Sequence, residues 1–210
     1  MPNPIRAVAL DKDGTLFNTE AHYAAALKAE LAAAGAHLSP EQATAIIGLD
    51  TPRTFARLGQ LFPTLDLARL QEQVHRHYLR LLGQRVDFMA GAPELIRAIK
   101  ARGLPLALVS SDNRAGVEHN FHHSAAPELL ALFDLIITLE DVAAPKPSPE
   151  PYQKVMERFA LAPAELLVVE DSVLGAESAR AAGATVLCYR REPLAGCAAI
   201  QNLSEALAWL

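Results

Sequence analysis

Short apolar runs alternate with segments of helical hydrophobic spacing over the second half of the chain. Such alternation is typical of a parallel sheet covered by helices on both faces, because parallel strands need crossover connections that helices supply. The class predicted from this pattern is therefore α/β. The predicted helices span residues 93–101, 114–122, 149–159 and 174–182, and the predicted strands span residues 104–109, 135–138, 166–169 and 185–189.

A further buried strand is predicted near the N-terminus, over residues 5–10. An alanine-rich, helical stretch without a convincing strand separates it from the alternating region. Helix starts are indicated near Thr19, at Ser39-Pro40, at Thr51-Pro52 and at Asp66. The sequence thus predicts a four-helix insertion over residues 16–85, within a core made of residues 1–15 and 86–210.

The first predicted strand ends in two carboxylates two residues apart, Asp11 and Asp13, followed by Gly14 and Thr15. Residues i and i+2 of a strand point to the same face, so these two anions repel each other unless a cation lies beside them. Mg²⁺ suits this pattern, because it commonly binds one or two carboxylates together with phosphate oxygens. An ordinary Asp-Gly turn is the alternative that this run alone leaves open.

Three more polar positions stand out: Ser110 and Glu170-Asp171 end apolar runs, and Lys146 stands between prolines just before a predicted helix. The carboxyl ends of parallel strands share one edge of the sheet, which is where open α/β sheets bind ligands. We therefore expect all four polar positions to meet at that edge. Taken singly, each has an ordinary structural interpretation as a helix cap or a solvated side chain.

This order of Asp-x-Asp, Ser, Lys and Glu-Asp resembles the haloacid dehalogenase-like superfamily of phosphotransferases, over nearly the whole chain. The stretch 168–183, VVEDSVLGAESARAAG, looks like the phosphoglycolate phosphatase and β-phosphoglucomutase branch. The resemblance implies a Rossmann-like core sheet with the helical insertion as a cap. It also implies a Mg²⁺-dependent phosphatase that hydrolyses a small phosphorylated metabolite through an aspartyl-phosphate.

The same resemblance implies a role for each site residue. Asp11 is the nucleophile, and Asp13 is the general acid that later activates water. Ser110 binds a phosphoryl oxygen, and Lys146 neutralises the nucleophile and the phosphoryl charge. The implied metal ligands are Asp11, the Asp13 backbone carbonyl, Asp171 and Glu170, and the expected substrate contacts are Gly14, Ser111, Asn113 and Arg53.

Arg53 follows Gly48-Leu49-Asp50 in a loop between two predicted helices, where related enzymes place their specificity loop. An arginine there can grip a carboxylate or a second phosphate, although a solvated arginine is an equal alternative. Lys12 lies between the two acids, where an apolar residue is commoner in the family. Strand alternation predicts that Lys12 points away from the pocket, and the sequence suggests no function for it.

The mutase branch is the main alternative activity. Its members usually carry a histidine twelve residues after the nucleophile, and this chain has Tyr23 there, with His22 one place away. Dehalogenation is disfavoured because Asp13 would have no task in it, and the phosphonate-hydrolysing branch has a non-acidic residue at the Asp13 position. A catalytically inactive binding module would require a damaged motif, and all four motifs are intact.

The net charge of −5 shows no basic footprint for nucleic acid. No apolar run is long enough for a membrane span, and Asp11 interrupts any signal-peptide core, so we expect a cytoplasmic protein. A monomer or weak dimer is expected. Cys188 and Cys197 are expected to be reduced thiols, and His119, His122 and His123 to belong to a surface helix.

Overall fold

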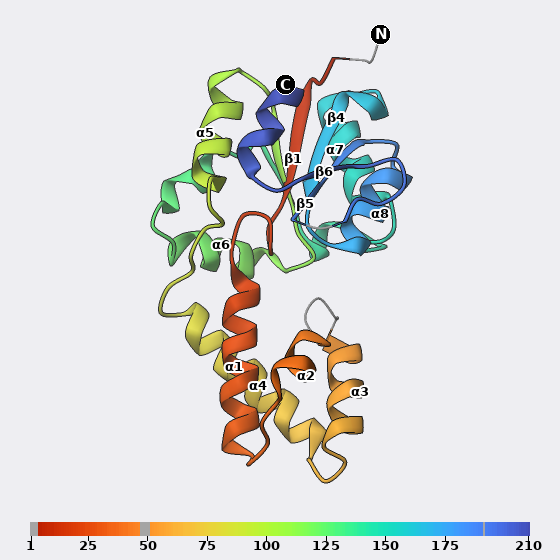
Figure 1. Ribbon diagram of the computed structural model, residues 1–210. Coiled ribbons are helices and arrows are strands. Elements are labelled where there is room, and N and C mark those ends of the chain that lie inside the picture. Colours follow the sequence, from red (N-terminus) through yellow and green to blue (C-terminus); the bar gives the residue numbers. More distant parts are fainter. Residues whose placement is uncertain (1–3, 47–50, 191) are drawn as a thin grey trace. The chain divides into compact units, whose positions relative to one another are not determined.

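The computed structural model describes residues 4–46, 51–190 and 192–210. The chain divides into two compact units (Figure 1). The core unit contains residues 1–19 and 85–210, and the helical unit contains residues 20–84.

The core unit is built on a six-stranded sheet in which every neighbouring pair is parallel. The strand order is β3-β2-β1-β4-β5-β6, so the chain moves outward to one side of β1 and then to the other. This reversal makes the carboxyl end of β1 the switch point of the sheet, where ligands of open α/β folds bind. The strands are β1 (Ala7–Asp11), β2 (Leu106–Val109), β3 (Leu135–Ile137), β4 (Leu166–Glu170), β5 (Thr185–Tyr189) and β6 (Ala198–Ile200).

Helices cover both faces of this sheet, with α5 and α6 on one side and α7 and α8 on the other (Figure 1). Apolar residues of α7 and α8, such as Tyr152, Val155 and Ala176, pack on alternate residues of the strands, such as Ala9 and Val168. All five residues of β1 and of β4 are buried, as expected for central strands of a sheet with helices on both faces. The helices are α5 (Ala92–Ala101), α6 (Arg114–His122), α7 (Glu150–Phe159) and α8 (Val173–Ala181).

The predicted parallel α/β architecture is confirmed, and most predicted elements fall within two residues of the observed ones. Strand β6 was missed because it has only three residues, of which Ile200 alone is buried, and such a short run shows no alternating pattern. The short 3-10 segments were also missed, because they form where the chain turns and have no periodic pattern of apolar residues. These segments are η1 (Pro127–Leu132), η2 (Leu139–Asp141), η3 (Pro163–Glu165) and η4 (Leu203–Trp209).

The helical unit has its own apolar core, in which Leu27, Leu58 and Val74 are buried. At its edge the rings of Tyr23 and Tyr78 meet edge to face, 5.8 Å apart. Asp66 starts one helix by accepting a bond from the Arg69 backbone nitrogen at 3.0 Å. Its helices are α1 (Thr19–Ala33), whose first residue belongs to the core unit, α2 (Pro40–Thr44), α3 (Thr51–Leu61) and α4 (Leu67–Leu82).

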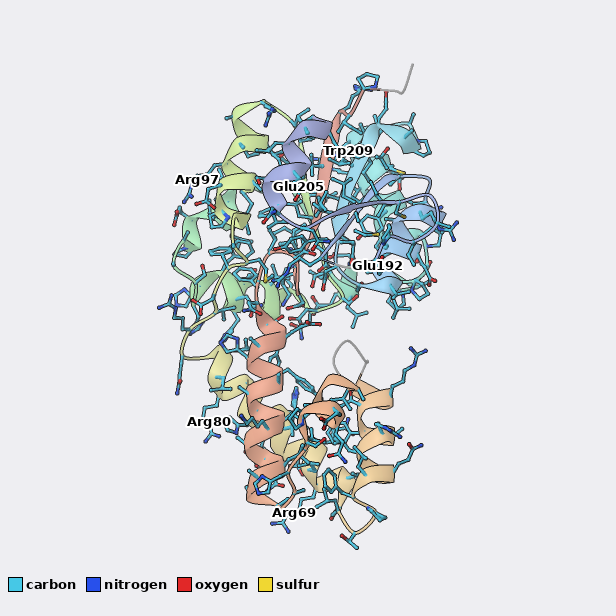
Figure 2. The ribbon with its side chains drawn as sticks, viewed as in Figure 1. Arg69, Arg80, Arg97, Glu192, Glu205 and Trp209 are labelled. Atoms are coloured by element: carbon cyan, nitrogen blue, oxygen red, sulfur yellow. The ribbon has the colours of Figure 1, made fainter. Side chains whose placement is uncertain are left out.

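The arginines of the helical unit are exposed, and Figure 2 shows Arg69 and Arg80 directed outward from α4. Among the described residues, no helix is both long enough and apolar enough to span a bilayer.

Candidate active site

The polar positions at the ends of β1, β2 and β4 lie at one edge of the core sheet. Asp11 is the last residue of β1, and the next residues leave the sheet in a tight turn in which the Gly14 nitrogen donates to Phe17 oxygen at 2.8 Å. Gly14 has a φ of +81°, and a Cβ there would collide with the Asp171 carboxylate. Glycine is therefore required both by the backbone conformation and by the close approach of Asp171, the residue that follows β4.

Lys146 connects the strand ends through its side chain. Its Nζ lies 2.6 Å from Asp11 Oδ1, 2.5 Å from Glu170 Oε1 and 3.2 Å from the Val109 carbonyl oxygen. The side chain is 5% exposed. Burial alone would lower the pKa of Lys146, but the charges of Asp11 and Glu170 outweigh it and hold the pKa well above its usual value. Lys146 is thus a permanent cation beside Asp11.

Glu170 is fully buried, and both of its carboxylate oxygens accept hydrogen bonds. Oε1 accepts from Lys146 and from the Tyr152 hydroxyl at 3.1 Å, and Oε2 accepts from the Ser172 nitrogen and hydroxyl. These bonds orient Glu170 toward Lys146. Tyr152 is a participant that sequence reasoning missed, since a tyrosine at an apolar helical position gives no signal apart from its nearness to Lys146 in the chain.

Asp11, Glu170 and Asp171 each place a carboxylate oxygen within 4.8 Å of the other two. Burial, followed by the charge of Glu170, raises the pKa of Asp11 well above its ordinary value despite the opposing effect of Lys146. Three carboxylates against one ammonium leave a negative excess that a divalent cation would offset. The donor set is all oxygen, so the residues fit a hard cation such as Mg²⁺.

Asp13 stands apart from that cluster of three acids. Its side chain is 41% exposed, and its Oδ1 accepts a hydrogen bond from the Thr19 hydroxyl at 2.8 Å. Its Oδ2 lies 3.2 Å from the Nζ of Lys12. A carboxyl group that is oriented by two donors and still open to solvent is suited to exchange protons with a ligand and with water.

The prediction that Lys12 points away from the pocket is wrong. Strand β1 ends at Asp11, so the alternation does not extend to Lys12, and the chain turns with both Leu16 and Phe17 nitrogens donating to its carbonyl. The Lys12 side chain is 1% exposed, and its Nζ donates to Asp112 Oδ2 at 2.7 Å.

Ser110 is buried at the end of β2, where its hydroxyl accepts a bond from the Asp112 nitrogen at 3.0 Å. Ser111 is exposed. Asn113 caps the N-terminus of α6, with its side-chain oxygen accepting from the Gly116 nitrogen at 2.8 Å. Residues 110–113 connect the end of β2 with the N-terminus of α6. The backbone nitrogens at a helix N-terminus favour anions.

Arg53 belongs to the other unit, where it is exposed in the first turn of α3. The preceding loop positions, 48–50, lie outside the described residues.

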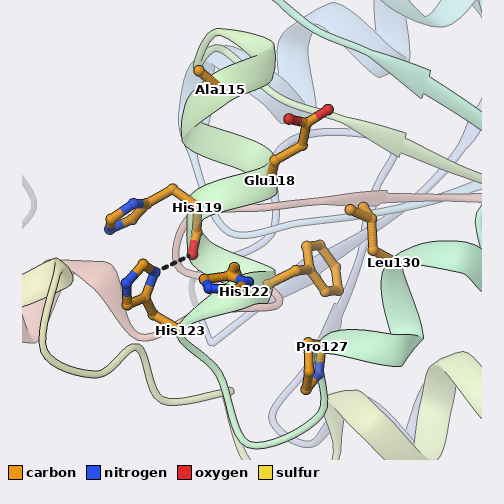
Figure 3. A pocket seen from close by; sticks show the side chains of 8 residues that line it. Ala115, Glu118, His119, His122, His123, Pro127 and Leu130 are labelled. Atoms are coloured by element: carbon orange, nitrogen blue, oxygen red, sulfur yellow. Dashed lines mark hydrogen bonds between the residues drawn. The ribbon is translucent and has the colours of Figure 1, made fainter.

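The three histidines near the end of α6 are close together: the rings of His119 and His123 stack 4.1 Å apart, and the ring of His122 meets that of His123 edge to face at 5.0 Å. The histidines line a surface hollow of about 520 Å³, in which His123 Nδ1 lies 2.9 Å from the His119 carbonyl (Figure 3). This hydrogen bond lies at the C-terminal end of α6, where His123 is the capping residue.

Comparison with known proteins supports one family. The model of the haloacid dehalogenase-like hydrolases matches residues 8–189. A phosphoglycolate phosphatase of Nitrosospira multiformis is 34% identical over 193 residues, covering 89% of this chain and 84% of that protein.

Solved structures show the same fold. A family hydrolase of Deinococcus radiodurans with bound phosphate and sodium has a TM-score of 0.83 at 26% identity, covering 98% of this chain and 96% of that one. A candidate β-phosphoglucomutase of Thermotoga maritima has a TM-score of 0.78 at 25% identity, covering 97% of each chain.

Proposed function

The chain belongs to the haloacid dehalogenase-like hydrolase family, and we propose that it is a Mg²⁺-dependent phosphatase of small phosphorylated metabolites that works through an aspartyl-phosphate. The observation that carries the proposal is the Lys146 ammonium bound between Asp11 and Glu170 at the switch point of the sheet. A buried carboxylate held beside a permanent cation is suited to attack an anionic phosphoryl group.

In the proposed reaction, an Asp11 carboxylate oxygen attacks phosphorus and the bond from phosphorus to the substrate oxygen breaks. Asp13 gives its proton to that leaving oxygen. Asp13 then takes a proton from water, the water oxygen attacks phosphorus, and the bond to Asp11 breaks to release inorganic phosphate. Lys146 offsets the charge on the phosphoryl oxygens, and the Ser110 hydroxyl donates to one of them.

Asp11, Asp171 and the backbone carbonyl of Asp13 are the groups that would hold Mg²⁺. Bound there, Mg²⁺ would supply charge neutralisation for the phosphoryl group and lower the raised pKa of Asp11. Glu170 was also expected as a ligand, but its four hydrogen bonds favour a role in orienting Lys146.

The helical unit is proposed to act as the cap that recognises the part of the substrate remote from phosphorus, with Arg53 as one contact. The phosphoglycolate phosphatase relative supports a substrate with a second anionic group, which a guanidinium can bind through two hydrogen bonds.

A sugar-phosphate mutase is the second candidate, favoured by the likeness to the Thermotoga structure. Tyr23 occupies the place of the histidine expected in such enzymes, and its ring packs against Tyr78 in the helical unit. Its side chain is a phenol, which lacks the two ring nitrogens of the imidazole that the mutases carry at this place. The phosphatase is therefore the better supported of the two.

A substrate screen tests the proposal. The purified protein with Mg²⁺ is incubated with phosphoglycolate, sugar phosphates, nucleotides and lipid-precursor phosphates, and inorganic phosphate is measured. Phosphorus NMR of β-glucose 1-phosphate with catalytic glucose 1,6-bisphosphate tests the mutase. We expect free phosphate from at least one substrate, whereas glucose 6-phosphate formed faster than free phosphate would favour the mutase.

A further inference from the structure

We propose that Lys12 is a positioning residue for Asp13: its buried ammonium ties the Asp13 carboxylate to Asp112 and so holds Asp13 in place to protonate the leaving oxygen. This inference rests on the proposed function and adds a residue for which the sequence suggested no role. It is carried by the geometry of Lys12 between two loops of the core unit.

Lys12 joins the turn after β1 to the segment after β2. Its Nζ lies 2.7 Å from Asp112 Oδ2 and 3.2 Å from Asp13 Oδ2, so one cation separates two carboxylates that would otherwise repel each other. The lysine side chain is almost completely buried, and a buried ammonium is stable only where anions compensate it. Lys12 is thereby confined to this position.

Asp112 is itself fixed on the far side of the bridge. Its Oδ1 accepts from the Asn113 nitrogen at 2.8 Å, and a Cβ at Gly116 would collide with its carboxylate. Helix α6 therefore leaves room for Asp112 to receive the lysine. The Asp112 nitrogen in turn donates to the Ser110 hydroxyl, so the bridge also connects Asp13 with the phosphate-binding segment.

Asp13 is held from two directions, by Thr19 at Oδ1 and by Lys12 at Oδ2. Without Lys12, the exposed carboxylate would keep one donor and would be repelled by Asp112. Displacement of the general acid slows the hydrolysis of esters with poor leaving groups most. An alkoxide needs a proton as it departs, whereas p-nitrophenolate does not. A loss of positive charge near the phosphoryl group would instead slow both kinds of substrate equally.

The test compares kcat/KM for an alkyl phosphate and for p-nitrophenyl phosphate in Lys12→Met, which keeps an unbranched side chain but removes the ammonium. We expect kcat/KM to fall about 30- to 100-fold for the alkyl phosphate and less than about threefold for the aryl phosphate. Lys100→Met is the matched control, since Lys100 also pairs with an aspartate, Asp134 at 2.6 Å, and should leave the ratio of the two values unchanged. Equal losses on both substrates would overturn the proposal and leave the phosphatase intact.

Two further measurements separate positioning from other effects. In an Asp13→Asn background, Lys12→Met should not change the ratio further, and a further change would contradict action through Asp13. Should Lys12→Met fail to fold, Lys12→Gln supplies a neutral donor for the same comparison. A crystal structure of the variant should show the Asp13 carboxylate displaced, and an unmoved carboxylate would overturn the inference even if the wild-type protein hydrolysed neither substrate and the proposed function failed.

Discussion

Lys146 and Asp11 are 135 residues apart in the chain, yet Lys146 Nζ lies 2.6 Å from Asp11 Oδ1 at the switch point of the sheet. Both side chains are almost completely buried. The ends of β1, β2 and β4 supply the partners of Lys146, which itself lies in the loop before α7, so the site exists only when the parallel sheet has formed.

Replacing Lys146 with methionine should abolish most of the activity. The variant keeps an unbranched side chain but removes the cation that faces both Asp11 and Glu170, so kcat should fall by a factor of about 10² or more. Steady-state hydrolysis of p-nitrophenyl phosphate measures the loss. Circular dichroism provides the control that the variant is folded, and a folded Lys146→Met with nearly normal kcat would refute the role of this cation.

Metal removal should stop the reaction. Chelation should eliminate turnover, Mg²⁺ should restore it, and Asp171→Ala should raise the Mg²⁺ concentration needed for half-maximal activity, because Asp171 is one of three acids whose oxygens converge. Ca²⁺ should not replace Mg²⁺, since its larger coordination shell misplaces the reacting groups. Full activity in excess chelator, or equal turnover with Ca²⁺, would contradict this prediction.

Tyr152→Phe should weaken the site without destroying it. The substitution removes the hydroxyl that donates to Glu170 Oε1, while Lys146 and Ser172 still hold that carboxylate. We expect the free energy of unfolding to fall by about 1 to 2 kcal/mol and kcat by a small factor. Urea unfolding measures the first effect. Tyr189→Phe, another buried tyrosine, is the control, and equal changes in kcat for both variants would show that Tyr152 has no special link to Glu170.

Arg53→Ala should raise KM for the best metabolite found in the screen far more than KM for p-nitrophenyl phosphate. The reason is that the guanidinium is proposed to bind the remote part of the metabolite, which the aryl ester lacks. Arg57→Ala is a matched control, because Arg57 is an exposed arginine of the same helix that bonds to Gln60. A rise in KM of equal size for both substrates would assign Arg53 a general role.

The fold and the clustering of the strand-end side chains could be predicted because their signals are local. Asp11, Ser110 and Asp171 each follow an apolar run, and the parallel topology brings such ends together. Lys12 and Tyr152 could not be predicted in the same way. The burial of Lys12 depends on a turn that ends the strand alternation, and the contact of Tyr152 with Glu170 joins α7 to β4 across the core.

The central claim is that Asp11 becomes phosphorylated during turnover, and mass spectrometry tests it most directly. The enzyme is mixed with excess substrate and Mg²⁺, quenched in acid within milliseconds and digested, with Asp11→Asn treated in parallel. We predict that the wild-type peptide containing Asp11 gains one phosphoryl group, that borohydride converts this residue to homoserine, and that Asp11→Asn shows neither change and retains less than about 1% of kcat. Steady turnover in Asp11→Asn, or a phosphoryl group found on another residue, would contradict the proposed mechanism.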